Sequence, residues 1–142
     1  MTNASEAAQK SNELFEAMPL LRKFISESQI QTMAAGAQGE EREYFIDAML
    51  ELRDTFNTMP KTYEQDGKGN EAVVYLHYFR GGMDWYITEK DMGDEQIQAF
   101  GLADLGMGFP ELGYISIEEL VENGIELDLH WTQKTLAEVK SA

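Results

Sequence analysis

The sequence contains no cysteine among its 142 residues. This absence excludes disulfide bonds, thiol nucleophiles and thiolate metal sites, and it is compatible with a reducing compartment. No apolar run approaches the roughly 20 residues that a membrane-spanning helix needs. Residues 1–11 are polar and lack the apolar stretch of a secretory signal. We therefore expect a cytoplasmic protein that has no membrane partner.

Basic residues are scarce as well. The chain has 11 Lys and Arg against 26 Asp and Glu, which gives a formal net charge of −15. Residues 1–80 carry 13 acids and 8 bases, whereas residues 81–142 carry 13 acids and only 3 bases. An acidic surface repels phosphate backbones and attracts basic proteins, so we expect no direct nucleic-acid binding. Solubility alone is the simpler explanation of the same charge.

The pattern of apolar residues predicts an α+β fold, with N-terminal helices followed by a small antiparallel sheet and short C-terminal helices. Residues 4–57 show helical spacing, with a second helix predicted to begin at Pro19 and a break predicted at residues 36–39. The strongest helix is Glu40–Phe56, where apolar residues recur at i, i+4 and i+8. The length suits a single domain, 1–142, with a helical part at 1–58 and a sheet part at 59–142.

Strand-like patterns begin after a turn-rich segment, residues 65–70, which we expect to be an exposed loop. Val73–Phe79 and Trp85–Glu89 predict a hairpin around residues 80–82. The other predicted elements are strands at Ile97–Leu102 and Leu112–Ile115, a strand or extended segment at Glu126–Trp131, and short helices that begin at the capping boxes of Ser116 and Thr135.

Four residues are candidates for catalysis, namely Asp84, Glu89, Glu111 and His130. Asp84 and Glu89 lie five positions apart on one predicted strand, so strict alternation places them on opposite faces. Glu111 can approach either carboxylate only from a neighbouring turn. The simpler interpretation is that Asp84 and Glu89 bond local backbone and hold the hairpin in place.

The chain has two histidines, His77 and His130. His130 follows Asp128 by two residues, so both side chains lie on one side of an extended strand, and this pair of residue types can ligate a metal. Two ligands do not make a metal site, and we expect neither a metal nor another cofactor. We expect His77, in the middle of a strand, to be a packed and hydrogen-bonded residue.

Another set of acids lies on predicted turns and on one short helix. Carboxylates spaced irregularly on a rigid frame imitate phosphates and can occupy the DNA-binding groove of an enzyme. The candidate binding residues are Asp91, Asp94, Glu95, Asp104, Glu118, Glu119 and Glu122.

Several segments of the second half resemble a known family. They are Tyr75–Phe79, Asp84–Glu89, Phe100–Leu102, Pro110–Ser116 and the closing segment Glu126–Trp131. In order and spacing they are similar to the bacterial family named domain of unknown function 2958, over roughly residues 59–139. The family-motif positions are Trp85, Tyr86, Phe100, Gly101, Glu111, Gly113 and Tyr114. Leu127 stands where relatives usually carry a basic residue, and Met83 where many carry an aromatic one.

The resemblance implies a biological setting and no catalytic mechanism. Members are found largely on plasmids, phages and other mobile elements, often near anti-restriction or conjugation genes. The leading hypothesis is a non-enzymatic accessory protein that binds a basic nucleic-acid-handling enzyme, of the restriction or CRISPR type, through an acidic, DNA-mimicking surface. One alternative is a small hydrolase-like enzyme with a carboxylate and histidine cleft. Another is a self-assembling accessory domain in conjugation or plasmid maintenance, a homodimer through the helix Glu40–Phe56.

Overall fold

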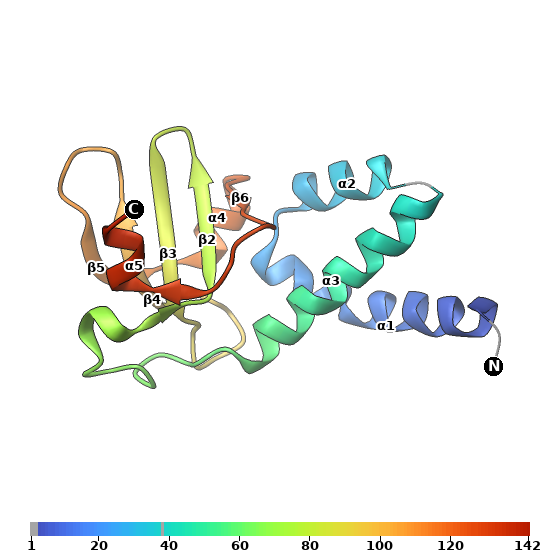
Figure 1. Ribbon diagram of the computed structural model, residues 1–142, viewed down its shortest axis with the longest axis horizontal. Helices are drawn as coiled ribbons and strands as arrows, with labels where there is room; N and C mark the ends of the chain where they lie inside the picture. The colour runs from blue at the N-terminus through green and yellow to red at the C-terminus, as the bar shows by residue number, and fades with distance from the viewer. Residues whose placement is uncertain (1–2, 38) are drawn as a thin grey trace.

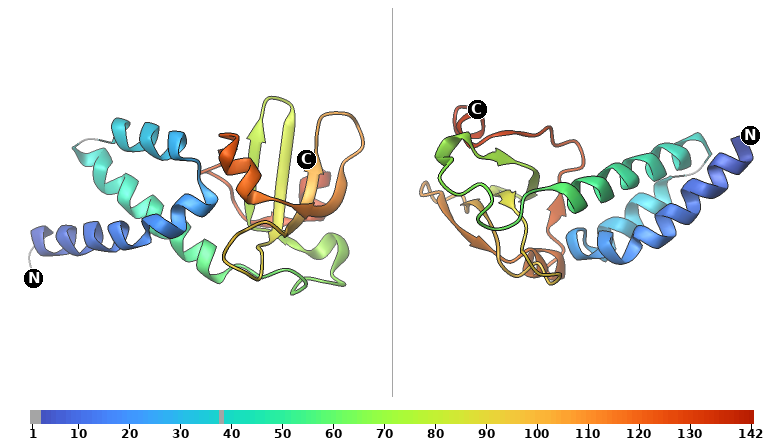
Figure 2. Two further views of the ribbon diagram at one scale, coloured as in Figure 1. Left: turned by 180° about the vertical axis from the view of Figure 1, so that it is seen from behind. Right: turned by 90° about the horizontal axis from the view of Figure 1, so that it is seen from below.

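The computed structural model describes residues 3–37 and 39–142. Helices α1 (Asn3–Phe24), α2 (Glu27–Gly36) and α3 (Glu40–Thr58) come first, and an antiparallel sheet with short helices follows them. The molecule is elongated, and the first turns of α1 lie far from the sheet (Figure 1). The same arrangement is seen from behind and from below in Figure 2. The predicted α+β fold is confirmed.

Helix α1 passes through Pro19 without ending, so the prediction of a second helix at this residue is wrong. A proline inside a helix costs a backbone hydrogen bond. Ala17, Leu21 and Phe24 lie on both sides of Pro19 in the chain and are buried in the core, and this packing outweighs the loss. The predicted break at residues 36–39 is confirmed where α2 ends and α3 begins, although Gln38 lies outside the described residues.

The main sheet has five strands in the order β5 (Glu111–Ile115), β4 (Ala99–Asp104), β3 (Met83–Glu89), β2 (Leu76–Arg80) and β6 (Glu126–Leu127). All neighbouring strands are antiparallel, and β2 and β3 form the predicted hairpin. A second pair joins β1 (Val73–Val74) to β7 (Lys134–Thr135). The short helices are η1 (Gly69–Glu71), α4 (Ile117–Glu122) and α5 (Leu136–Lys140).

Three predicted strands differ from the observed ones because of strand pairing or of side-chain hydrogen bonds to the backbone. Val73–Phe79 is split between two sheets, since β1 pairs with β7 and β2 pairs with β3. The strand predicted from Ile97 begins at Ala99, because the Ile97 N–H donates to the Asp91 carboxylate. Only the first two residues of Glu126–Trp131 form a strand. The Asp128 carboxylate then accepts the His130 N–H and turns the chain.

The core lies between the helices and one face of the sheet. Phe24 of α1 stacks on Phe56 of α3, with ring centroids 4.2 Å apart. The buried Tyr78 of β2 donates its hydroxyl to the Phe24 carbonyl at 2.6 Å. Lys90, just after β3, donates to the carbonyl of Phe56 at 2.6 Å and so satisfies the C-terminal end of α3. The helical part and the sheet part therefore share one hydrophobic cluster.

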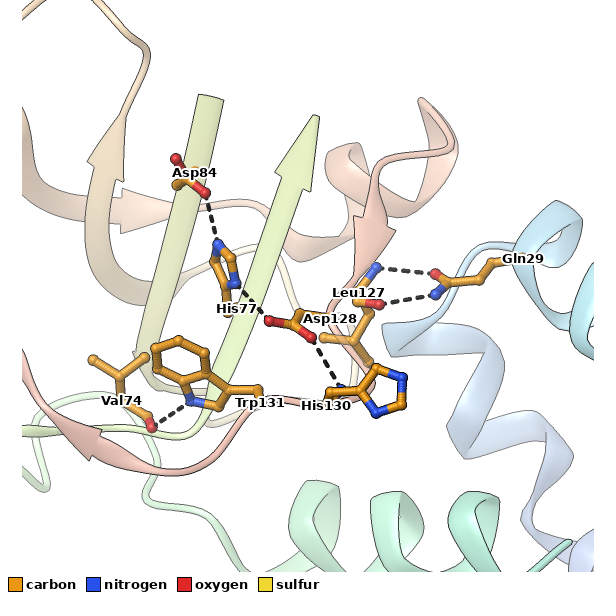
Figure 3. Close-up of polar contacts among 8 residues, drawn as sticks. All are labelled: Gln29, Val74, His77, Asp84, Leu127, Asp128, His130 and Trp131. Atoms are coloured by element: carbon orange, nitrogen blue, oxygen red, sulfur yellow. Dashed lines mark hydrogen bonds and ion pairs between the residues drawn. The ribbon is translucent and has the colours of Figure 1, made fainter. Parts of the chain in front are cut away.

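The β6 edge of the sheet is closed by a side chain of α2. The Gln29 amide donates to the Leu127 carbonyl at 2.8 Å and accepts the Leu127 N–H at 2.9 Å (Figure 3). One side chain thus makes the pair of hydrogen bonds that a neighbouring strand would make. The other edge, β5, is covered by no further strand in the described part of the chain.

The opposite face of the sheet carries a smaller cluster of apolar residues beneath α5. Ala72, Val74, Leu102 and Leu136 are its buried members. Among the described residues, no helix has both the length and the apolar character to cross a membrane.

Candidate functional site

His77 lies between two carboxylates on the face of the sheet that the core does not use. Its Nε2 is 2.7 Å from Asp84 Oδ1, and its Nδ1 is 3.0 Å from Asp128 Oδ2 (Figure 3). The His77 side chain is 13% exposed, and those of Asp84 and Asp128 are 30% and 27% exposed. Carboxylates only accept hydrogen bonds, so the imidazole makes both bonds when both its nitrogens carry protons. We call these three residues the histidine clamp.

Aromatic rings pack around the clamp. The His77 ring stacks on Tyr86, with centroids 4.7 Å apart and planes 7° apart. The ring centroids of Trp131 and His77 are 5.1 Å apart, and the Trp131 indole N–H donates to the Val74 carbonyl at 3.0 Å (Figure 3). Burial, and then the charges of Asp84 and Asp104, raise the pKa of the Tyr86 phenol. The clamp therefore joins β2, β3 and the segment after β6 through one set of polar and aromatic contacts.

Three of the segments that carry the family resemblance meet at this clamp. His77 comes from Tyr75–Phe79, Asp84 from Asp84–Glu89, and Asp128 from Glu126–Trp131. Sequence reasoning expected His77 to be packed and hydrogen-bonded, but it missed both partners. For Asp84, the pairing register of the hairpin was a signal that sequence reasoning could have used. Since Arg80 pairs with Met83, Asp84 lies diagonal to His77 on the same face.

Asp84 and Glu89 share one face of β3, contrary to the expectation from strict alternation. Asp84 pairs with Asp104 and Glu89 with Phe100, because the register shifts between Ile87 and Glu89. Directly paired side chains lie on the same face, and Asp104 and Phe100 are four residues apart on β4. At about 3.3 Å per residue, Asp84 and Glu89 are still roughly 15 Å apart along the strand, too far for an acid–base pair.

Glu89 holds the loop before η1. Its side chain is buried, and its two oxygens accept the N–H groups of Tyr63 at 2.8 Å and Gln65 at 2.9 Å. Gln65 is buried as well and bonds both backbone groups of Val73. The expectation that residues 65–70 form an exposed loop is therefore wrong at its first residue, because this glutamine is the loop's polar anchor.

The other two catalytic candidates lie elsewhere. Glu111 is exposed and pairs with Ala103, which faces the side of the sheet opposite Asp84. His130 is exposed, and its ring points away from His77, whereas the Asp128 carboxylate points toward His77 (Figure 3). The structure thus brings none of Asp84, Glu89, Glu111 and His130 together. In the described part of the chain, no group of three or more His, Cys, Asp or Glu side chains is arranged to hold a metal ion.

Two of the seven acidic binding candidates bond their own loops. The Asp91 carboxylate accepts the N–H groups of Gly93, Ile97 and Gln98. Burial opposes the charge of this carboxylate, but these backbone bonds outweigh burial and lower its pKa. Asp104 accepts the Gly106 N–H at 3.0 Å. Both acids are explained by turn structure.

Four of the remaining acids line one groove of about 470 Å³ between α1, α4 and the loop before β4. We call it the acidic groove, and its carboxylates belong to Asp94, Glu95, Glu118 and Glu122. Within residues 3–37 and 39–142, none of these four carboxylates makes a hydrogen bond or ion pair, and the same holds for exposed Glu119 beside them. Arg22 and Lys23 of α1 also line it, and Arg22 bonds Glu27 at 2.9 Å.

Several family-motif positions have structural roles. Gly101 lies so close to β3 that an added Cβ would be 2.0 Å from the Tyr86 carbonyl oxygen, so this position excludes every side chain. Trp85 packs against the main core, and Phe100 meets Tyr114 edge to face at 5.9 Å. Tyr114 and Tyr63 share a hydroxyl–hydroxyl hydrogen bond, which raises the pKa of Tyr114.

The fold and the clamp define an α+β protein in which three separate segments meet around one histidine. A family described as protein of unknown function, DUF2958, matches residues 46–137, which is more than half of the chain, and the protein belongs to this family. The resemblance that the sequence indicated is thereby confirmed. No curated protein and no solved structure matches the chain significantly.

Proposed function

We propose that this protein is a non-enzymatic binding protein of the cytoplasm, and that its acidic groove docks onto a basic, nucleic-acid-handling enzyme. The observation that carries the proposal is the state of the four groove carboxylates. Asp91 and Asp104 bond their own turns, whereas Asp94, Glu95, Glu118 and Glu122 make no hydrogen bond or ion pair within the described residues. Their charge is available to a partner.

The frame beneath these carboxylates supports mimicry of phosphates. Helix α4 begins at Ser116, whose hydroxyl accepts the Glu119 N–H at 3.1 Å. The Glu118 N–H donates to the Gln96 carbonyl at 3.2 Å and ties α4 to the loop that carries Asp94 and Glu95. Acids on a scaffold tied in this way lose little conformational freedom on binding, which favours affinity.

The charge around the groove favours a basic partner. Residues 91–133 contain ten acids and no Lys or Arg, so the four groove carboxylates outnumber the two cations, Arg22 and Lys23, that α1 contributes to the groove. A surface with such an excess of acids speeds association with a positive surface and opposes contact with phosphate backbones. In its sharpest form, the proposal is that a mobile element uses this protein for counter-defence, with a restriction or CRISPR-type nuclease as the partner.

Three structural observations favour binding over the alternatives. Asp84, Glu89, Glu111 and His130, the residues of the enzyme alternative, do not come together in one cleft. Both nitrogens of His77 already face carboxylates, so the clamp leaves no free imidazole nitrogen to act as a general base. The helix offered for self-assembly uses Met49 and Phe56 within the monomer core, while Tyr44 is its exposed aromatic at 72%. Self-association through this helix would therefore rest on few side chains.

The test is a charge reversal in the groove. The double variant Glu118→Lys and Glu122→Lys is compared with Glu16→Lys and Glu51→Lys, two exposed acids of α1 and α3 that give the same net charge. Tagged proteins are used to capture partners from a lysate at low and high salt. Captured nucleic-acid enzymes are then assayed for stoichiometric inhibition.

We expect the groove variant to lose capture and inhibition, and the control variant to retain both. Added salt should weaken the wild-type complex, because exposed charge pairs are screened. Equal inhibition by the two variants would refute the groove as the docking surface. Measured turnover by the wild-type protein would favour the enzyme alternative instead.

A further inference from the structure

One edge of the main sheet, β6, is closed by a side chain, whereas the other edge, β5, is open in the described part of the chain. At β6, Gln29 bonds both backbone groups of Leu127 and closes the edge. At β5, five residues, Glu111–Ile115, pair with β4 on one side, and no strand of the described chain pairs with the other side. Figures 1 and 2 show β5 at the end of the molecule away from the long helices. Folded proteins usually blunt such edges, because unpaired backbone groups accept additional strands.

The side chains next to this edge are apolar and exposed. Leu112 and Tyr114 of β5 are 48% and 55% exposed, and Phe109, in the loop before β5, is 83% exposed. The same loop exposes Leu105 and Met107. Several exposed apolar side chains beside an open edge are typical of an interaction site.

A groove lies directly beside the strand. Its volume is about 410 Å³, and Phe100, Leu112 and Leu136 provide much of its apolar lining. Tyr63 and the buried Glu89 lie at its other side, on the loop and strand that the Glu89 hydrogen bonds hold together. When an extended peptide pairs with an edge strand, alternate side chains enter pockets on one face of the sheet.

The charge near β5 selects the occupant. Glu111 begins the strand, Glu119 follows its end, and Asp66 lines the groove. No Lys or Arg occurs in residues 91–133. A second copy of this chain would carry the same formal net charge of −15, and this like charge opposes self-pairing.

From these observations we propose that the β5 edge binds an extended segment of a partner protein in which basic and apolar residues alternate. The segment adds a strand to β5, its apolar side chains enter the groove of Phe100, Leu112 and Leu136, and its basic side chains face the surrounding acids. This surface shares no lining residue with the acidic groove, so the inference does not rest on the proposed function.

The probe is a short synthetic peptide that alternates lysine with valine, titrated into the full-length protein and followed by amide chemical shifts. An otherwise identical peptide with glutamate in place of lysine tests the charge. Two further peptides carry N-methyl groups, one on every lysine amide and the other on every valine amide. In a strand, alternate amides point to opposite sides, so one of these two peptides blocks pairing and the other preserves it.

We expect shifts in residues 99–115 and in the loop of Tyr63, loss of binding for the glutamate peptide, and loss for only one N-methylated peptide. Leu112→Lys should weaken binding by about tenfold, since it places a charge in the apolar groove. Phe15→Lys, at an 80% exposed site on α1, is the matched control and should bind normally. Unchanged thermal unfolding of both variants shows that the fold is retained.

Other outcomes overturn the proposal. Equal binding of both N-methylated peptides would exclude strand addition, and equal binding of the glutamate peptide would exclude a basic partner. Shifts confined to other residues would place the peptide elsewhere. A concentration-dependent dimer of the free protein, with residues 111–115 protected from hydrogen exchange, would show that a second copy occupies the edge.

Discussion

Replacing His77 by phenylalanine removes both hydrogen bonds of the histidine clamp but keeps an aromatic ring against Tyr86. His77 binds Asp84 at 2.7 Å and Asp128 at 3.0 Å, and each bond joins a charged partner. Hydrogen bonds to charged groups contribute roughly 1.5–3 kcal/mol each. The two carboxylates are 30% and 27% exposed, so water partly replaces the imidazole in the variant.

We therefore take about half of the summed value and expect His77→Phe to lower the free energy of unfolding by about 2–3 kcal/mol. For a domain of this size the midpoint temperature should fall by about 5–10 °C. The assay is urea unfolding at neutral pH followed by circular dichroism, with the slope against urea concentration unchanged. The exposed His130 supplies the control, because His130→Phe should stay within about 0.5 kcal/mol of wild type.

A double-mutant cycle between His77→Phe and Asp128→Asn tests the mechanism. Residues in direct contact show interaction free energies of about 0.5–3 kcal/mol, whereas independent residues are additive. We expect a coupling of about 1 kcal/mol or more. If His77→Phe unfolds like wild type, or if the two changes are additive, the clamp does not hold the strands together and the reasoning fails.

Three further predictions concern other contacts of the fold. Gly101→Ala places a Cβ 2.0 Å from the Tyr86 carbonyl oxygen, so we expect the free energy of unfolding in urea to fall by more than about 3 kcal/mol. A variant with the urea midpoint of wild type would contradict the close approach of Gly101 to β3. Gln29→Ala leaves both backbone groups of Leu127 without their partner. We expect the free energy of unfolding to fall by about 2 kcal/mol and the Leu127 amide to exchange its hydrogen faster. Unchanged exchange would show that α2 does not close this edge. The folded-state pKa of Asp91 lies below its ordinary value, because backbone N–H bonds to the carboxylate outweigh burial. The charged carboxylate therefore stabilises the fold at neutral pH, and this contribution is lost as the pH falls through the folded-state pKa. Asp91→Asn should therefore lower the urea midpoint at pH 7 by more than it does below about pH 4, and an equal difference at both pH values would contradict this assignment.

Local patterns predicted much of the fold. The helix Glu40–Phe56 and the hairpin around residues 80–82 were predictable because apolar period and turn residues act over short distances. The full capping box of Thr135 and Glu138 was predictable for the same reason. The continuity of α1 through Pro19 was not, because its cause is tertiary packing of Leu21 and Phe24.

The candidate site depended on contacts that local patterns do not contain. Asp128 was assigned to His130 by strand alternation, but its carboxylate reaches His77, 51 positions away in the chain. The bulge between Ile87 and Glu89 reversed the expected face of Glu89, and a bulge has no reliable sequence signal here. The acidic candidates could be chosen by residue type, but only hydrogen bonds distinguish the occupied carboxylates of Asp91 and Asp104 from those of the acidic groove.

The main core includes residues that lie before the start of the family match, and this determines which fragment of the chain can fold. The family match begins at residue 46, inside α3, yet Leu21, Phe24 and Ile25 of the preceding segment are fully buried against the sheet. A fragment cut at the start of the match would lose α1 and leave Tyr78 without the carbonyl that accepts its hydroxyl. In this protein the cooperative folding unit is therefore larger than the stretch of sequence shared with the family, and protein prepared for biochemical work should retain all three N-terminal helices.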